Sequence, residues 1–375
     1  MLSLYVHIPF CRERCLYCDF FLVTRKEHMG PFFKALGEET RAKAELLRGR
    51  RIKAIHFGGG TPSIAPVTLI SDWLSQVAGL ASLDPDAEIT LEANPEDLDP
   101  LVLAELRGAG VNRLSIGVQS FTDRKLRALG RAHTAADSSR TVSEALERFD
   151  SVAIDLMCGA EGEGLDEWEG DLRAAMGLGV PHVSAYMLTL EEKTRLWRDV
   201  RRGMVELPGE ELQAAMYDMA HRMLTGAGYR HYEVSNYALE GFHSRYNLGS
   251  WMREPYLGFG PSAHSFMVEG GVETRFSNAC SLTRYLADPA HAVDFREVLT
   301  PWQRFDEEVF LSLRINRGLP LEFLKRGHSS ELQRLDALLG GFLEKGWISL
   351  EGEVVTLTEA GFLFADQVAE ELMHG

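Results

Sequence analysis

Three absences narrow the class of this protein. No stretch of the sequence reaches the ~18 uninterrupted apolar residues that a membrane-spanning helix needs. The net charge is −16, so the broad basic surface of nucleic-acid-binding proteins is missing. The N-terminus has neither a basic segment nor a long apolar core, so a signal peptide is not expected. The sequence therefore predicts a cytoplasmic protein with no transmembrane segment and no nucleic-acid partner.

Cysteine is also scarce, and its distribution is uneven. Of the five cysteines, Cys11, Cys15 and Cys18 lie close together, whereas Cys158 and Cys280 stand alone. An odd, clustered set in a reducing compartment does not fit a disulfide framework. The cluster therefore indicates a metal site, and the other two cysteines are expected to be ordinary buried thiols.

What the sequence does contain is a repeated alternation of strand-like and helical segments. The 375 residues, with 45% hydrophobic composition, suffice for a large α/β domain and a smaller one. The expected strands are Leu4–Ile8, Ile52–Phe57, Glu88–Ala93, Arg113–Gly117, Val152–Met157 and Val183–Leu188. The expected helices are Lys26–Leu47, Val67–Ala78, Pro100–Gly108, Ala135–Arg148, Asp166–Gly177 and Glu210–Thr225. This order predicts a parallel sheet with helical crossovers. A closed barrel, a partial barrel and an open doubly wound sheet all fit it.

The last third of the chain changes character. The stretch Asn236–Gly271 is rich in glycine and aromatic residues and is too long for a simple linker, so it is expected to be functional. From about residue 300, helical segments precede two short strands, Trp347–Leu350 and Val354–Leu357. That order predicts a small winged-helix-like domain. Because the segment is not basic, a packing or lid role is expected rather than DNA binding.

The cysteine segment follows the first strand directly. Thiolates are soft ligands that suit zinc, copper(I) and iron–sulfur clusters. Closely spaced cysteines on a loop are typical of four-iron clusters, and three thiolates would leave one iron open for a ligand. A zinc site is the alternative, with His7, Asp19 or a distant cysteine as fourth ligand. Zinc sites usually consist of two spaced pairs, however, and the sequence has no second pair.

The pattern C-x-x-x-C-x-x-C after a first strand resembles the radical S-adenosylmethionine (SAM) superfamily. The preceding segment Tyr5–Phe10 resembles that of the branch containing the oxygen-independent coproporphyrinogen III oxidases. The resemblance implies a partial (β/α)6 TIM-like barrel over residues 1–235, with a 4Fe–4S cluster and SAM. It also implies a segment over 236–300 that contacts substrate or haem, and a winged-helix-like domain over 301–375.

Several residues at or just after the expected strands match this family. Glycines allow close backbone approach, a glutamine can both donate and accept, and an arginine can grip a carboxylate with two hydrogen bonds. The resemblance implies that residues 58–62 meet the amino group of SAM, that Arg131 pairs with its carboxylate and that Asp155 binds its ribose. The full set of implied cofactor-binding residues is Tyr5, Gly59, Gly60, Thr61, Glu92, Gln119, Arg131 and Asp155.

Position 20 separates two arms of this branch. The oxidases carry a fourth cysteine two residues after the third, and Phe20 stands there in this chain. In this respect the chain resembles the haem chaperones of the HemW type, which carry a His-Asn-x-x-Tyr-Trp motif. Here the motif is Tyr246–Trp251, with Asn247 retained and Ser250 in place of the tyrosine.

Because Tyr246 replaces the motif's histidine, the usual haem contact is altered, although a phenolate can ligate haem iron. The haem candidates are Tyr246, Asn247, Trp251 and His264, with His243 as a further histidine.

Three functions remain open at this point. The first is a haem chaperone that delivers haem to haemoproteins. The second is a radical enzyme that oxidatively decarboxylates coproporphyrinogen III through a 5′-deoxyadenosyl radical, which Phe20 disfavours. The third is a zinc-stabilised binding module without redox chemistry. For the first two, a flavodoxin- or ferredoxin-type electron donor is an expected partner.

Overall fold

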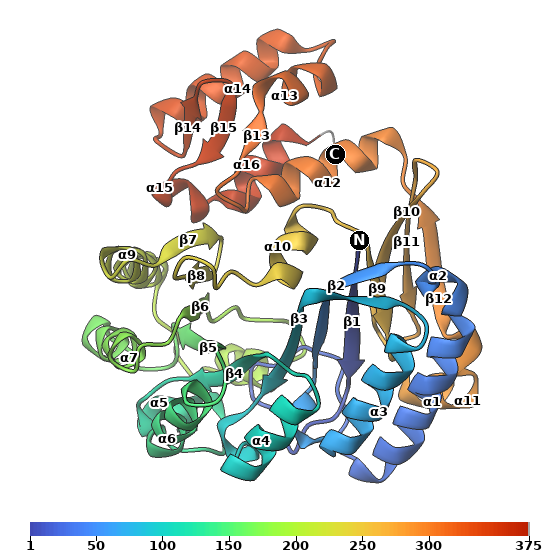
Figure 1. Ribbon diagram of the computed structural model, residues 1–375. Coiled ribbons are helices and arrows are strands. Elements are labelled where there is room, and N and C mark those ends of the chain that lie inside the picture. Colours follow the sequence, from blue (N-terminus) through green and yellow to red (C-terminus); the bar gives the residue numbers. More distant parts are fainter. Residues whose placement is uncertain (374–375) are drawn as a thin grey trace.

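Six parallel strands form the centre of the protein in the computed structural model, which describes residues 1–373 (Figure 1). They pair in chain order, β1 with β2 and so on to β6. Their bounds are β1 Leu2–Ile8, β2 Arg51–Gly59, β3 Ser82–Ala93, β4 Arg113–Gln119, β5 Ser151–Cys158 and β6 His182–Met187. Most of their residues are buried, as expected for parallel strands covered on both faces. The parallel sheet predicted from the sequence is confirmed.

Helices follow these strands, and most of them cover the outer face of the curved sheet (Figure 1), whereas the helix containing Leu196 contacts the cysteine loop, where the Leu196 N–H donates to the Leu16 carbonyl at 2.9 Å. They are α1 Met29–Ala42, α2 Ala44–Leu47, α3 Val67–Ala78, α4 Pro100–Gly108, α5 Asp123–Leu129, α6 Ala135–Leu146, α7 Leu165–Gly177, α8 Arg195–Arg201 and α9 Glu210–Gly226. Short 3-10 turns occupy Lys26–His28, Pro62–Ile64, Pro95–Asp97 and Pro289–His291. Asp99, the residue just ahead of Pro100, caps the start of α4. Its carboxylate accepts hydrogen bonds from two backbone N–H groups of the first turn.

The predicted helix Lys26–Leu47 is divided in the structure. A 3-10 turn precedes α1, and Lys43 separates α1 from α2. The Lys43 ammonium donates to the Glu39 carboxylate at 2.6 Å and to the Gly258 carbonyl at 2.8 Å. Both contacts belong to the tertiary structure, and helical periodicity carries no sign of them.

The sheet continues beyond the predicted strands on both sides. The sequence missed six of its strands: β7 Arg230–Glu233, β8 Asn236–Ala238, β9 Tyr256–Phe259, β10 His264–Glu269, β11 Val272–Asn278 and β12 Val293–Val298. Two helices lie among them, α10 Arg245–Trp251 and α11 Leu282–Ala287. The sheet order is β12-β11-β10-β9-β1-β2-β3-β4-β5-β6-β8-β7. Its two end strands, β12 and β7, are not neighbours, so the barrel is partial, as the family resemblance implied.

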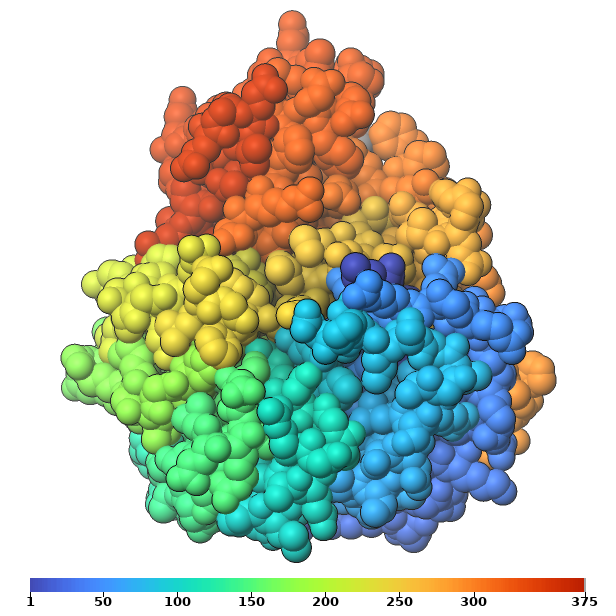
Figure 2. Space-filling view, in the orientation of Figure 1, coloured from blue at the N-terminus to red at the C-terminus, as the bar shows by residue number. Residues whose placement is uncertain are grey.

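The C-terminal residues form a separate lobe with its own apolar core (Figures 1 and 2). Its elements are α12 Pro301–Ser312, β13 Leu319–Pro320, α13 Leu321–Gly327, α14 Leu332–Glu344, β14 Ile348–Glu351, β15 Val354–Leu357, α15 Glu359–Phe362 and α16 Ala365–Leu372. A helix, a strand, two helices and a hairpin follow one another, which is the order of a winged helix. Among residues 1–373, no helix has the length and apolar character needed to cross a membrane.

Candidate functional site

The cysteine loop leaves the end of β1 and is closed at its base by backbone hydrogen bonds. The Cys11 N–H donates to the Val23 carbonyl at 3.0 Å, and the Val23 N–H donates to the Pro9 carbonyl at 2.7 Å. Cys11 is buried, whereas Cys15 and Cys18 are half-buried. Burial, together with the neighbouring Cys18 and Cys15, raises the pKa of the Cys11 thiol to about 11. The three thiols are therefore near enough to interact electrostatically.

The surroundings of the loop fit a cluster better than a single metal ion. Within residues 1–373, no three His, Cys, Asp or Glu side chains converge closely enough to hold one metal ion. A 4Fe–4S cluster binds each thiolate through a different iron, so its ligands need not converge on one point. Two donors also reach the sulfurs: the Thr61 hydroxyl is 3.3 Å from Cys11 Sγ, and an Arg131 N–H lies 3.4 Å from Cys15 Sγ. The Thr61 contact lowers the pKa of Cys11 and so favours its thiolate, the form that binds metal.

Residues 58–60 pack tightly against β1 and the start of the cysteine loop. Gly59 has φ = 103°, and a Cβ there would lie 2.5 Å from the His7 ring. A Cβ on Gly60 would lie 2.6 Å from the Phe10 carbonyl oxygen. The Thr61 N–H donates to that same carbonyl at 2.7 Å. These glycines are required by close packing within the protein. Their contact with SAM stays a prediction.

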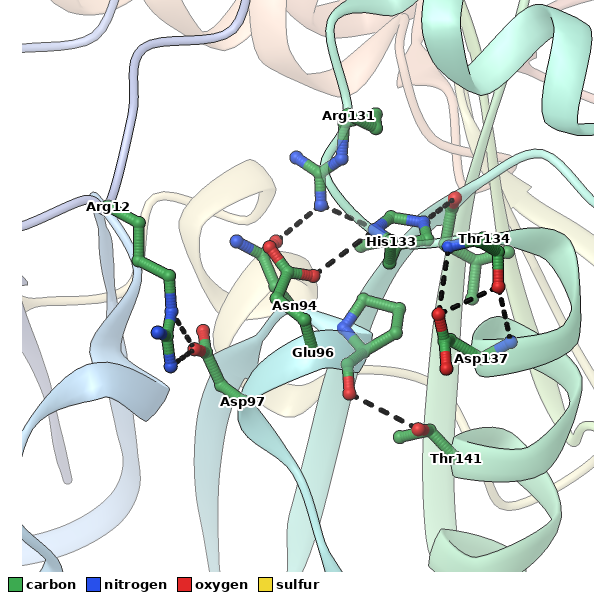
Figure 3. A network of polar contacts seen from close by, with 12 residues as sticks. Arg12, Asn94, Glu96, Asp97, Arg131, His133, Thr134, Asp137 and Thr141 are labelled. Atoms are coloured by element: carbon green, nitrogen blue, oxygen red, sulfur yellow. Dashed lines mark hydrogen bonds and ion pairs between the residues drawn. The ribbon is translucent and has the colours of Figure 1, made fainter.

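Arg131 and Gln119 each present polar atoms that the described residues leave without partners. The Arg131 guanidinium donates to Asn94 Oδ1 at 2.5 Å and to the Gly117 carbonyl at 2.9 Å, while its Nε is buried and unpaired within residues 1–373 (Figure 3). Gln119 is buried in a left-handed conformation with φ = 64°, and its Oε1 is likewise unpaired there. Buried groups of this kind usually have partners, so both side chains fit a bound polar ligand.

The same network ties the cysteine loop to β3. Arg12 forms an ion pair with Asp97 at 2.5 Å, and His133 contacts Glu96 at 3.1 Å (Figure 3). The Ser63 hydroxyl also donates to Asp97 at 3.0 Å. Segments that follow β1, β2 and β3 are therefore fixed to one another around the cysteines.

Two carboxylates lie on the neighbouring strands. Glu92 accepts a hydrogen bond from His56 Nε2 at 2.8 Å. Asp155 is half-buried beside Ser115, at 3.4 Å, and Ser184. Burial and, to a lesser extent, the negative charge of Glu92 raise the pKa of Asp155 to about 6. The predicted residues of β1 to β5 thus lie along one end of the parallel strands, the usual place for ligand sites in such sheets.

A separate cleft of about 510 Å³ opens beside α10. Three predicted haem candidates, Tyr246, Asn247 and Trp251, line it. The Tyr246 ring also stacks on Tyr5 and His56, with centroids 5.9 and 4.8 Å apart. Tyr246 therefore lies between the cleft and the strand residues predicted to bind SAM.

The two histidine candidates lie elsewhere. His264 is exposed and is not part of the cleft lining; its charge acts on the pKa of His7, beside the cysteine loop. His243 packs edge-on against Tyr232, with ring centroids 4.7 Å apart. The structure therefore brings together three of the haem candidates and leaves both histidines outside the cleft.

Most of the cleft lining escaped the sequence analysis. The residues not foreseen are Tyr186, Glu233, Val234, Ser235, Asn236, Ser250, Arg253, Tyr256, Phe266, Arg275, Glu307 and Leu311. Burial raises the pKa of Glu233 to about 7, and the buried Asn236 has an Oδ1 without a partner within residues 1–373. Arg253 pairs with Glu273 at 2.6 Å and with Glu307 at 3.1 Å. None of them was named as a haem candidate, although Asn236, Ser250, Arg253, Tyr256, Phe266 and Arg275 lie within the segment 236–300 that was expected to contact substrate or haem.

Comparisons with known proteins agree with this architecture. Residues 5–175 match the Radical SAM superfamily, and residues 299–364 match the HemN C-terminal domain. The heme chaperone HemW of Mycobacterium tuberculosis (strain H37Rv) is 36% identical over 379 residues, covering 99% of this chain and 94% of that protein. HemW of Bacillus subtilis (strain 168) is 32% identical over 375 residues, covering 98% of each chain.

Among solved structures, coproporphyrinogen III oxidase (HemN) from Escherichia coli, a radical SAM enzyme, superposes with a TM-score of 0.85. The match has 24% sequence identity and covers 100% of this chain and 90% of that one, and it establishes the shared fold. The relatives of higher identity decide the family. This chain belongs to the HemW family of the radical SAM superfamily.

Proposed function

We propose that this protein is a haem chaperone that holds a 4Fe–4S cluster and SAM, binds haem in the cleft beside α10 and delivers it to haemoproteins. The observation that carries the proposal is the position of Asn247 and Trp251, the two motif residues that this chain retains. Both line a cleft whose volume of about 510 Å³ lies in the range of small-molecule and cofactor sites. The relatives named heme chaperone HemW span nearly the whole chain.

The cleft has the mixed lining that a porphyrin requires. Trp251, Tyr256 and Phe266 offer aromatic surface for a flat macrocycle. Arg275 borders the same cleft and can pair with carboxylates, which haem carries as propionates. Tyr246 contributes its ring, which contacts Tyr5 and His56 on the other side.

The cofactor site of the proposal lies along the ends of β1 to β5. Cys11, Cys15 and Cys18 would hold the cluster, and the implied SAM contacts are Tyr5, Gly59, Gly60, Thr61, Glu92, Gln119, Arg131 and Asp155. When bound, the cluster supplies single electrons and an open iron for SAM. The unpaired Nε of Arg131 and Oε1 of Gln119 support this assignment.

The cellular location and the remaining partners follow from the chemistry of the proposed cluster. We assign the protein to the cytoplasm, because a reducing compartment keeps thiols available for a cluster, and all five cysteines are free. Acceptor haemoproteins and a flavodoxin- or ferredoxin-type electron donor complete the proposal.

A haem titration of the anaerobically reconstituted protein tests the function. We expect a saturable change of the Soret band with one haem per chain in the wild type. Trp251→Ala should weaken binding by about tenfold through lost aromatic contact. The matched control is Trp197→Ala, because Trp197 lies on α8 outside the cleft lining and should leave haem binding unchanged.

Three outcomes decide against the proposal. Formation of protoporphyrinogen from coproporphyrinogen III, SAM and a reductant on the same sample would favour the oxidase instead. Zinc in place of iron after reconstitution, without visible iron–sulfur absorption, would favour the binding module. A wild type without a saturable Soret change would remove the haem function.

A further inference from the structure

A buried charged cluster lies behind the end of β4, next to the residues that follow Gln119. Lys125 of α5 forms ion pairs with Glu163 and with Asp171 of α7, the latter at 2.9 Å. All three side chains are fully buried. The Lys125 ammonium also lies 4.9 Å from the centre of the Trp168 ring. Burying three charged groups is costly unless each is well paired, so this cluster invites a specific explanation.

Asp171 connects the cluster to the residues that directly follow Gln119. Its carboxylate accepts from the Ser120 hydroxyl at 2.8 Å and from the Phe121 N–H at 2.6 Å. The Ser120 hydroxyl in turn accepts from the Thr122 N–H at 3.0 Å. The backbone after β4 is therefore fixed from the side of α7.

The conformation held in this way is an unfavourable one. Gln119 has φ = 64°, and for a residue other than glycine such a backbone is unfavourable and persists only where the surroundings impose it. The register between β4 and β5 is also irregular between Ile116 and Gln119, as at a β-bulge that redirects a side chain. The Asp171 contacts supply the restraint that this turn needs.

Glu163 pairs with the same lysine but holds a different segment. Its carboxylate accepts from the Ala160 N–H at 2.9 Å, in the loop after β5. The cluster has one positive and two negative groups, so removing either carboxylate leaves a balanced ion pair. Glu163 and Asp171 thus form a matched pair that differs in which loop each one holds.

We propose that Asp171 is a positioning residue for SAM, acting through Ser120 and Phe121 to keep Gln119 in the left-handed turn. In that turn the unpaired Oε1 of Gln119 is available to the nucleoside part of the cofactor. This inference rests on the proposed SAM site. It adds to that site a residue of α7 that does not itself contact the ligand.

The test measures SAM affinity by equilibrium dialysis with labelled SAM on the cluster-reconstituted protein. Asp171→Asn should raise the Kd for SAM by about tenfold, the equivalent of about 1.4 kcal/mol, with the cluster content unchanged. Glu163→Gln should change the Kd much less, although both variants remove one carboxylate from Lys125. Equal Kd values for the two variants would overturn the inference.

A double-variant cycle separates positioning from general destabilisation. If Asp171 acts through Gln119, then Asp171→Asn has little further effect on the Kd in a Gln119→Ala background. Full additivity of the two changes would contradict the inference. Should Asp171→Asn fail to fold, Ser120→Ala removes the hydroxyl link alone; we expect a weaker Kd, and a wild-type Kd would overturn the inference.

The same experiment distinguishes this inference from the proposed function. A wild type that keeps its cluster but binds no SAM would overturn the cofactor site, and the role of Asp171 with it. A wild type that binds SAM, together with an Asp171→Asn variant of equal affinity, would overturn the role of Asp171 alone.

Discussion

The predicted cofactor site and the cleft beside α10 are built in different ways. The cofactor residues follow successive parallel strands and lie in short motifs, such as residues 11–18 and 58–62. The cleft lining comes from scattered positions between Tyr186 and Leu311, including α12, the first helix of the C-terminal lobe. A site at the ends of parallel strands can be read from strand order, whereas a cleft between distant segments depends on how the whole chain folds.

Tyr246 is the point at which the two regions meet. Its ring stacks on Tyr5 and His56 on one side and lines the cleft on the other. His56 in turn contacts Glu92, one of the predicted SAM residues. The two sites are therefore adjacent but distinct, and variants should affect them separately.

The largest separation is expected from Cys11→Ala/Cys15→Ala/Cys18→Ala. This variant should lose the cluster completely, and with it SAM binding, because thiolates are the cluster's ligands. Haem binding in the cleft should remain, since the cleft lining contains no cysteine. Iron analysis, visible absorption and haem titration check these outcomes. Cys280→Ala is the control, because Cys280 is exposed and lies outside the loop. If the three-cysteine variant lost haem binding together with the cluster, the two sites would not be separate.

Gly59→Ala should also disturb the cofactor region selectively. The new Cβ would lie 2.5 Å from the His7 ring, and the backbone has φ = 103°, so a cost of about 1–3 kcal/mol or more is expected. Denaturant unfolding and iron content after reconstitution measure it. Gly30→Ala in α1 is the control, because no atom lies within 4 Å of its added Cβ. Equal stability of the two variants would show that the tight packing at Gly59 is not required.

The two regions each contain a carboxyl with a raised pKa: the half-buried Asp155, near 6, and the buried Glu233, near 7. Burial is the main cause in both cases, so the folded state keeps these protons at a pH where the unfolded state has released them. The free energy of unfolding should therefore fall as pH rises from about 4 towards 7, by about 1.4 kcal/mol per unit of pKa difference.

Each carboxyl can be removed from this pH dependence in turn. Asp155→Asn should flatten the decrease between pH about 4 and 6, and Glu233→Gln should flatten it up to about pH 7. Denaturant titrations across this pH range measure both. Unchanged slopes in both variants would mean that neither carboxyl titrates as the structure indicates.

The smallest effect is expected from Phe20→Cys. Phe20 is 66% exposed, so its side chain points away from the protein interior, and Cys11, Cys15 and Cys18 already supply the cluster thiolates. Iron content and visible absorption should match those of the wild type. Phe20→Ser serves as the control for the loss of the ring. Coproporphyrinogen decarboxylation gained only by the cysteine variant would make position 20 a determinant of function.

The sequence predicted more of the cofactor region than of the cleft beside α10. All six parallel strands were foreseen, because buried β-branched runs alternate with amphipathic helices. The short strands β7 to β12 were missed, since runs such as Arg230–Glu233 gain their stability from neighbours far away in sequence. Asp171 also gave no signal, because its proposed role depends on a contact between helix α7 and Phe121, which is distant in sequence. Local motifs therefore predicted the cofactor residues, whereas the segment 236–300 was recognised only in outline and the cleft itself required the structure.

Whether SAM and haem bind to the same molecule at the same time tests most directly that the two sites are distinct. The reconstituted wild type is dialysed against labelled SAM with and without saturating haem, and both ligands are quantified on the same sample. We predict that each wild-type chain binds one SAM and one haem together. The three-cysteine variant should lose SAM and retain haem. Displacement of SAM by haem in equal amounts would show a single shared site and contradict the account.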